Sequence, residues 1–249
     1  MTRRTTDESR DRVALSTGHE VALPLETEAA AAGAVFAGDA SAVRAALPSP
    51  LAPVRIGPGR APVVLVGVGY RRIGADAMAP YDEFGVLLPA THHPEDGPLG
   101  PERAAVRRGV GAFVDWLPVT TDPGRALGVE VWDYPKEVCE IEVVDGRDRH
   151  RVTVSAGGER IAELSVNRAP TVERRIPASS FAGRDPVREI PHLLDGRFGG
   201  WLGGASVALG PHSRADRLRE FGLADGQRAL ARVRSDGRFV VGRGESLPP

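Results

Sequence analysis

Short strand-like segments separated by turn residues fill the second half of the chain, and their spacing constrains the fold more than any other feature. Apolar and polar residues alternate in these segments, a pattern typical of half-buried strands. The segments occupy residues 138–144, 151–155, 160–166 and 205–209. Asp145-Gly146 and Gly157-Gly158 separate the first three, and such pairs favour tight hairpin turns. Residues 229–241 predict another hairpin, which turns at Ser235-Asp236-Gly237. Strands joined by such short turns are antiparallel.

The rest of the chain adds further strands and a few short helices. Strands are predicted at residues 29–36, 62–70, 81–88 and 111–120. Helices are predicted at residues 40–47, at residues 213–221 and from Asp122-Pro123 to about Gly128. Asp39 is a typical helix cap and Gly222 a typical helix end. Residues 129–136 are predicted as a turn or the entry to a strand. Alternating strand–helix units are absent, so we predict a mostly antiparallel, barrel-like α+β fold rather than a doubly wound parallel sheet.

We expect one domain at residues 21–249, preceded by a disordered tail at residues 1–20. No linker divides the 249-residue chain. The formal net charge of -1 gives no strong field that would favour nucleic acid or anionic lipid. Cys139 is the only cysteine, so no disulfide can form within the chain. The sequence contains no signal-peptide core and no apolar run long enough to cross a bilayer. These features predict a cytoplasmic protein with no nucleic-acid partner and no membrane partner.

Lys136 is the only lysine among the 32 lysine and arginine residues of the chain. Codon bias toward arginine accounts for the excess of arginine over lysine, but it does not account for the one lysine that is retained. Arginine replaces lysine readily on a solvated surface. It cannot replace lysine where a neutral, nucleophilic amine is needed, because guanidinium keeps its proton in proteins. The position of this lysine is therefore informative.

Two interpretations of Lys136 follow from its neighbours. The residue follows Pro135 and stands close in sequence to Trp132, Tyr134 and Val138. An apolar setting disfavours the ammonium ion and lowers the pKa of lysine, and a neutral amine attacks a carbonyl to form a Schiff base. The other interpretation is a surface lysine at a turn, with its stem lying over Trp132. Local composition favours neither.

Two other patterns suggest sites only weakly. Gly67-Val68-Gly69 follows a strand, as in dinucleotide-binding folds, but the third glycine comes too late, at Gly74. We interpret this pattern as a glycine-containing strand and turn. His92-His93 precedes Glu95 and Asp96, but adjacent residues of an extended chain point to opposite sides. We therefore predict a solvated loop there, and we expect no metal and no organic cofactor.

Residues 128–138 (GVEVWDYPKEV) resemble the lysine motif of the acetoacetate decarboxylase superfamily, in which Gly-Arg-Glu leads to Tyr/Phe-Pro-Lys. Residues 81–85 (YDEFG) resemble that family's Tyr-x-Glu segment, at about the expected distance upstream. Residues 41–51 (SAVRAALPSPL) and 210–226 (GPHSRADRLREFGLADG) resemble its N-terminal and C-terminal stretches. These similarities occur in the right order and cover most of the chain.

The resemblance implies a mostly antiparallel β-barrel-like fold and a Schiff-base lysine, which corresponds to Lys136. It also implies an acidic helper, Glu83, which shares one face of its strand with Tyr81 because side chains alternate along a strand. We expect the substrate, a small oxo compound, to contact Tyr81, Trp132, Tyr134 and Trp116. The resemblance implies a lyase that performs decarboxylation, aldol or dehydration chemistry, and we expect it to be a homo-oligomer.

Four positions depart from the decarboxylase pattern. Glu137 stands where the family has a second lysine, and Val129 where it has an arginine. An acid expected near Val66 and a substrate-binding arginine expected near Ala29 are missing. Candidate substitutes for that arginine are Arg71, Arg72 and Arg125. We therefore expect poor acetoacetate decarboxylation. A Schiff-base enzyme with another oxo substrate and a barrel that binds small molecules without catalysis are the two hypotheses.

Overall fold

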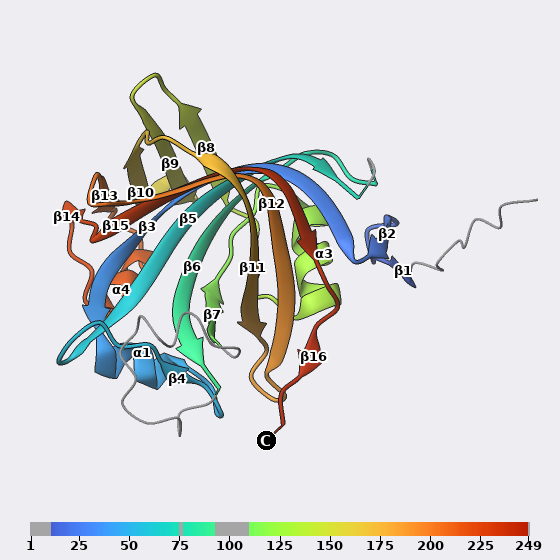
Figure 1. The fold of residues 1–249 in the computed structure, drawn as a ribbon, viewed down its shortest axis with the longest axis horizontal. Coiled ribbons are helices and arrows are strands. Elements are labelled where there is room, and N and C mark those ends of the chain that lie inside the picture. The colour runs from blue at the N-terminus through green and yellow to red at the C-terminus, as the bar shows by residue number, and fades with distance from the viewer. Residues whose placement is uncertain (1–10, 75–76, 93–109, 249) are drawn as a thin grey trace, which may run out of the picture.

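Seven strands close into a barrel in the computed structural model, which describes residues 11–74, 77–92 and 110–248 (Figure 1). In order around the barrel they are β11 (Val172–Ala182), β7 (Val110–Trp116), β6 (Asp82–Thr91), β5 (Arg60–Ile73), β3 (Leu25–Asp39), β15 (Ala231–Val241) and β12 (Arg188–Leu202). β12 also pairs with β11, which closes the ring. Neighbouring strands are antiparallel except for β7 and β11, which are parallel. The predicted fold class is confirmed.

A second sheet of five antiparallel strands packs against the barrel (Figure 1). Its order is β14 (Gln227–Arg228), β13 (Ala205–Leu209), β10 (Glu159–Asn167), β9 (Arg149–Ala156) and β8 (Glu140–Asp145). The hairpins predicted at Asp145-Gly146 and Gly157-Gly158 join β8 to β9 and β9 to β10. Gly67 lies within β5, where a Cβ would be 2.4 Å from a methyl carbon of Val152. Glycine therefore allows the two sheets to approach closely.

The helices and the remaining strands are short. Helix α1 (Ala40–Ala46) begins after Asp39, whose carboxylate accepts hydrogen bonds from the backbone N–H groups of Ser41 and Ala42. Helix α3 (Asp122–Trp132) begins after Thr121, whose hydroxyl accepts from Gly124, so its cap is one residue before the predicted one. The other elements are α4 (Arg214–Glu220), β1 (Asp11–Ala14), β2 (Glu20–Leu23), β4 (Ala52–Pro53) and β16 (Glu245–Ser246).

Buried apolar side chains form two clusters. The larger one lies between the barrel, the five-stranded sheet, α1 and α4, and it includes Trp116. The second surrounds α3 and combines Leu127 of the helix with Val114 and Ile190 of the barrel strands. This second cluster, which we call the α3 cluster, also contains Tyr81, Trp132 and Tyr134. Three of the four predicted substrate-binding side chains therefore share one region of the core.

The hairpin predicted at residues 229–241 is wrong, because β15 continues through Ser235-Asp236-Gly237 as a single strand. Gly237 lies opposite Gly196 of β12. A Cβ on Gly237 would lie 2.6 Å from the carbonyl oxygen of Asp195. Glycine is needed at this position because two strongly curved strands approach closely, and not because the chain turns.

The long strands β11 and β12 have no counterpart among the predicted elements. They contain Pro177, Pro191 and Gly199-Gly200, and proline and glycine weaken the sequence pattern of a strand. β1 falls within the tail predicted to be disordered, residues 1–20, and pairs with β2. The structure therefore differs from that prediction at residues 11–14.

Candidate active site

The backbone between β7 and α3 holds the two candidate catalytic residues on neighbouring segments. Val119 forms an antiparallel bridge with Glu83 of β6 and a parallel bridge with Val138. Its N–H group donates a hydrogen bond to the carbonyl of Glu137 at 2.9 Å. The extended segment at Val119 thus lies between β6 and the segment that carries Lys136. Side chains on the same face of β6 and of the Lys136 segment can meet across Val119.

The amine of Lys136 is buried beside Glu83. The exposed fraction of the side chain is 4% for Lys136 and 9% for Glu83, and the distance from Nζ to Oε2 is 2.6 Å. Nζ also donates to the hydroxyl of Tyr81 at 3.4 Å and lies 5.4 Å from the centre of its ring. The surface-lysine interpretation is therefore wrong. The predicted alternation, with Tyr81 and Glu83 on one face, is confirmed.

Two glycines of α3 make room for this arrangement. The helix predicted to end near Gly128 continues to Trp132, so the turn or strand predicted from residue 129 is wrong there. A Cβ on Gly128 would lie 2.3 Å from Cε of Lys136, and a Cβ on Gly124 would lie 3.1 Å from the ring of Tyr81. Glycine at these positions therefore forms a groove for the lysine stem and the tyrosine ring.

Burial and Glu83 act in opposite directions on the pKa of Lys136. Burial disfavours the ammonium ion and lowers the pKa, whereas the negative charge of Glu83 and the hydrogen bonds to Glu83 and Tyr81 raise it. The result is a pKa above the ordinary value of lysine. The lowering predicted from apolar neighbours alone is therefore wrong, because the ammonium group faces a carboxylate.

Two phenols beside the ion pair stay neutral. The hydroxyl of Tyr70 donates to Oε1 of Glu83 at 3.5 Å, and its ring lies 4.8 Å from that of Tyr81. Burial raises the pKa of Tyr81 to about 12 and the pKa of Tyr70 well above its ordinary value. Both phenols therefore remain hydrogen-bond donors over the neutral range. Tyr70 ends the predicted strand at residues 62–70, and no sequence motif marks it.

A second polar network lies beside Tyr134. Its hydroxyl is 2.6 Å from Oγ of Ser180, which is 2.8 Å from Nε2 of His192. Burial lowers the pKa of His192 to about 4, so the imidazole is neutral at neutral pH. Burial raises the pKa of Tyr134, and the charges of Lys136 and Glu83 also act on it. The network is therefore within electrostatic range of the amine. The sequence did not reveal it, because Ser180 and His192 lie on the unpredicted strands β11 and β12.

The two tryptophans predicted to bind substrate lie in different places. The ring of Trp132 is 5.9 Å from that of Tyr134, inside the α3 cluster. Trp116 belongs to the larger core cluster and packs edge-on against Phe84 at 6.2 Å. The structure thus brings Trp132 into the region of Lys136 and leaves Trp116 outside it.

The positions that depart from the decarboxylase pattern place no cation beside Lys136. The arginines considered as substitutes are each paired with a carboxylate: Arg71 with Asp236, Arg72 with Glu28 and Arg125 with Asp122. Glu137 bonds to the indole of Trp116 and to Arg214, away from the amine. Val129 has an exposed fraction of 36%. The charged partner of the amine is therefore Glu83.

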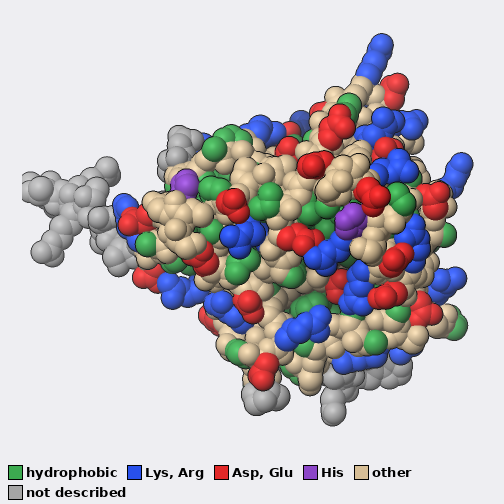
Figure 2. All heavy atoms as spheres, turned by 180° about the vertical axis from the view of Figure 1, so that it is seen from behind, with side chains coloured by type: hydrophobic (Ala, Val, Ile, Leu, Met, Phe, Trp, Pro, Cys, Tyr) green, Lys and Arg blue, Asp and Glu red, His purple; other side chains and the backbone are tan. Residues whose placement is uncertain are grey.

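In residues 11–74, 77–92 and 110–248, no group of three or more His, Cys, Asp and Glu side chains is arranged to hold a metal ion. The same part of the chain has no helix whose length and apolarity suffice to cross a bilayer. His93, Glu95 and Asp96 lie outside the described residues. Basic and acidic side chains are interspersed over the face in Figure 2, in keeping with the small net charge.

Comparison with protein families matches residues 14–225 to the family described as acetoacetate decarboxylase (ADC). Comparison with curated protein sequences gives no match. Among solved structures, acetoacetate decarboxylase from Legionella pneumophila is similar with a TM-score of 0.65 at 14% identity, covering 90% of this chain and 87% of that chain. The enduracididine biosynthesis enzyme MppR complexed with pyruvate gives 0.64 at 17% identity, covering 90% of each chain. An acetoacetate decarboxylase-like enzyme from Sphingomonas wittichii gives 0.62 at 16%, covering 90% and 92%.

Proposed function

Because the chain belongs to the acetoacetate decarboxylase family, we propose that it is a Schiff-base-forming lyase in which Lys136 condenses with the carbonyl group of a small oxo compound. The observation that carries this proposal is the buried ion pair between Lys136 and Glu83 at 2.6 Å. Burying two charges costs free energy that a replacement by apolar side chains would avoid. Their retention in a chain with no other lysine supports a chemical role.

The ion pair supplies both a nucleophile and a proton acceptor. A proton moves from Nζ of Lys136 to Glu83, and the free amine attacks the carbonyl carbon of the substrate. After one proton shifts from nitrogen to oxygen, Glu83 returns its proton to that oxygen and water leaves. An ammonium and a carbonyl thus become an iminium and a water molecule. The net charge of the site is unchanged, so the iminium takes the place of the ammonium beside the carboxylate of Glu83.

The iminium then acts as an electron sink. Glu83 is the group positioned to remove a proton from the carbon next to the iminium, which yields an enamine. The neutral hydroxyl of Tyr81 accepts a hydrogen bond from Nζ of Lys136 and holds the nitrogen in place. The neutral hydroxyl of Tyr70 donates to Oε1 of Glu83 and holds the carboxylate in place. An enamine supports aldol or dehydration chemistry, the reactions that we propose for this site.

Neutral groups around the pair favour a neutral substrate. Tyr70, Tyr81 and Tyr134 have raised pKa values and stay uncharged, and His192 is neutral above pH values of about 4. A substrate carboxylate would add a second negative charge beside that of Glu83, and a buried charge without a partner is costly. We therefore propose an aldehyde or ketone without a free carboxylate as substrate, and we expect slow decarboxylation of acetoacetate.

The competing function is binding of a small molecule without catalysis. The raised pKa of Lys136 favours this alternative, because a protonated amine is not a nucleophile. The two functions differ in whether the bound compound undergoes proton exchange at the carbon next to its carbonyl.

Deuterium exchange separates the two functions. We expect the protein to exchange the methyl hydrogens of acetone for deuterium in heavy water, followed by proton NMR, because the enamine picks up deuterium each time it reverts. Lys136→Arg keeps a positive charge but cannot form the Schiff base, so it should reduce exchange to the uncatalysed rate. Saturable acetone binding with no exchange by the unmodified protein would support binding alone and contradict the proposed enzyme.

A further inference from the structure

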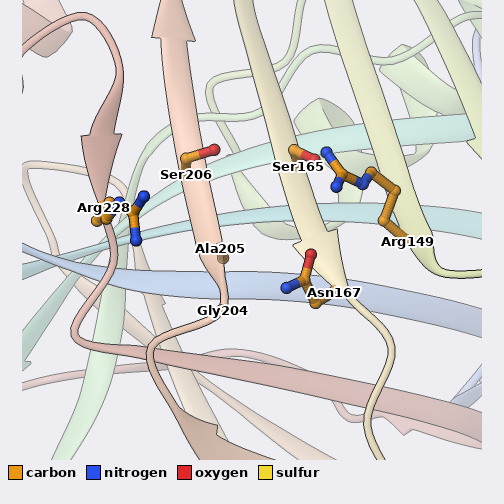
Figure 3. Close-up of a pocket in the computed structure, with 7 residues that line it drawn as sticks. All are labelled: Arg149, Ser165, Asn167, Gly204, Ala205, Ser206 and Arg228. Atoms are coloured by element: carbon orange, nitrogen blue, oxygen red, sulfur yellow. The ribbon is translucent and has the colours of Figure 1, made fainter.

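A polar hollow of about 200 Å³ lies on the outer face of the five-stranded sheet (Figure 3). Its polar lining consists of Arg149, Ser165, Asn167, Ser206 and Arg228, and it includes no acidic residue. Lys136 and Glu83 do not line it. The hollow is therefore separate from the candidate active site, and the proposed function assigns no role to it.

The register of four adjacent strands brings these side chains together. Ser165 of β10 lies opposite Ser206 of β13, and Ser206 lies opposite Arg228 of β14. Asn167 of β10 lies opposite Arg149 of β9. The intervening residues of these strands are buried, so the five side chains share the outer face. In Figure 3 the two arginines flank the serine hydroxyls from opposite sides.

Both arginines are available for a ligand. The side chains of Arg149 and Arg228 are exposed, and neither side chain forms a hydrogen bond or an ion pair with any other described residue. The nearest acid along β10 on this face, Glu163, is already paired with Arg151 at 3.3 Å. The positive charge at the hollow is therefore uncompensated by the part of the protein that the structure describes.

We propose that this hollow is a binding site for a phosphate group, carried by inorganic phosphate or by a small phosphorylated metabolite. Guanidinium is planar and matches the oxygens of phosphate with two parallel hydrogen bonds. Two such groups on opposite sides balance the double charge, and the hydroxyls of Ser165 and Ser206 donate to the remaining oxygens. The hollow is smaller than the roughly 300–1,000 Å³ of ordinary ligand pockets. It therefore fits one tetrahedral anion rather than a whole large ligand.

Calorimetric titration of the 249-residue chain at low ionic strength tests this proposal. We expect saturable binding of inorganic phosphate, weakened at least tenfold by the double variant Arg149→Gln/Arg228→Gln. The matched control Arg174→Gln/Arg175→Gln removes the same charge from exposed positions of β11 and should bind as the unmodified protein does. Equal weakening in both double variants would show only a general effect of net charge and would overturn the proposal.

Three further titrations sharpen the result. Ser165→Ala/Ser206→Ala should weaken phosphate binding without any change of charge, and unchanged affinity would contradict the proposed geometry. Titration with glycerol phosphate distinguishes a phosphorylated metabolite from free phosphate as the ligand. Tighter binding of glycerol phosphate than of inorganic phosphate supports a phosphorylated metabolite, and weaker binding of glycerol phosphate supports the free ion. Acetate binding as tight as phosphate binding would overturn the choice of a phosphate ligand. Circular dichroism spectra establish that each variant is folded.

Discussion

Glu83 sets the protonation state of Lys136, because burial alone lowers the pKa of the amine and the carboxylate reverses that effect. Glu83→Gln keeps the shape of the side chain and removes its charge. We predict that trapping of Lys136 by an aldehyde and borohydride then extends to lower pH than in the unmodified protein. Deuterium exchange should fall by about 100-fold or more, because the proton acceptor is gone.

Glu137→Gln is the matched control for this prediction. Its carboxylate is bonded to Trp116 and Arg214 rather than to the amine. We expect the pH profile of trapping to stay unchanged in this variant. An unchanged profile in Glu83→Gln as well would mean that Glu83 does not control the amine.

His192 makes the fold sensitive to acid. Its pKa is lowered to about 4 in the folded protein, so between the ordinary value near 6.5 and pH 4 the unfolded chain binds a proton that the folded chain does not. Stability should therefore fall as the pH is lowered through this interval, by on the order of 3 kcal/mol from this residue. Above the interval the imidazole is neutral in both states, and it contributes no pH dependence.

Urea denaturation between pH 7 and 4 measures this effect. His192→Asn removes the titrating ring, so the variant should lose less stability over the same interval than the unmodified protein. Parallel curves for the two proteins would refute the assignment to His192.

At the residue scale, the sequence predicts Lys136, Glu83 and Tyr81 because each stands in a motif or on a predicted strand face. The sequence does not predict that Tyr70 and Ser180 belong to the site, because their contacts depend on which strands pair. The direction of the lysine pKa also escapes prediction, because it depends on a distance of 2.6 Å between residues far apart in the chain.

Helix α3 holds the lysine stem at Gly128, where a Cβ would lie 2.3 Å from Cε of Lys136. Gly128→Ala should stabilise the helix by about 1 kcal/mol through its higher helix propensity. The clash between the new Cβ and the side chain of Lys136 should destabilise the fold by roughly 1–3 kcal/mol and force the lysine to move. We therefore predict that the variant stays helical, gains no stability and loses most trapping at Lys136. Circular dichroism, thermal unfolding and mass spectrometry measure these three quantities.

Val129→Ala is the control on the same helix, at a position with an exposed fraction of 36%. It should leave trapping unchanged. Full trapping in Gly128→Ala would show that the lysine does not need the groove of α3.

At the element scale, sequence patterns predict tight hairpins well and misinterpret glycines that allow close packing. Gly128 suggested a helix end and Gly237 a turn. Each instead lies inside a regular element, because another group occupies the space of the missing Cβ. A single sequence does not distinguish these uses of glycine, since both need a residue without a side chain.

The two strand pairings of β11 that close the barrel differ greatly in length. β11 pairs with β12 along all of Val172–Ala182, whereas its parallel pairing with β7 involves Ser180 and Phe181 alone. Few hydrogen bonds join β7 to β11, so we predict that these two strands separate before the other strand pairs of the barrel do. Amide hydrogen exchange followed by mass spectrometry should show less protection in β7 than in β5. Equal protection in both strands would contradict this prediction.

At the scale of the whole molecule, the fold class follows from the hairpin spacing and from the family resemblance. The closure of the barrel does not, because it depends on β11 and β12, whose proline and glycine residues conceal their alternation. The second polar network is built on the same two strands, so it was missed together with them.

Reductive trapping tests the central claim, that Lys136 forms a Schiff base, most directly. The chain offers a carbonyl compound two amines, that of Lys136 and the N-terminal one. Incubation with a small aldehyde or ketone and borohydride, followed by digestion and mass spectrometry, locates the adduct. We predict a mass increase on the peptide that contains Lys136, and its loss in Lys136→Arg. An adduct confined to the N-terminal amine would contradict this account.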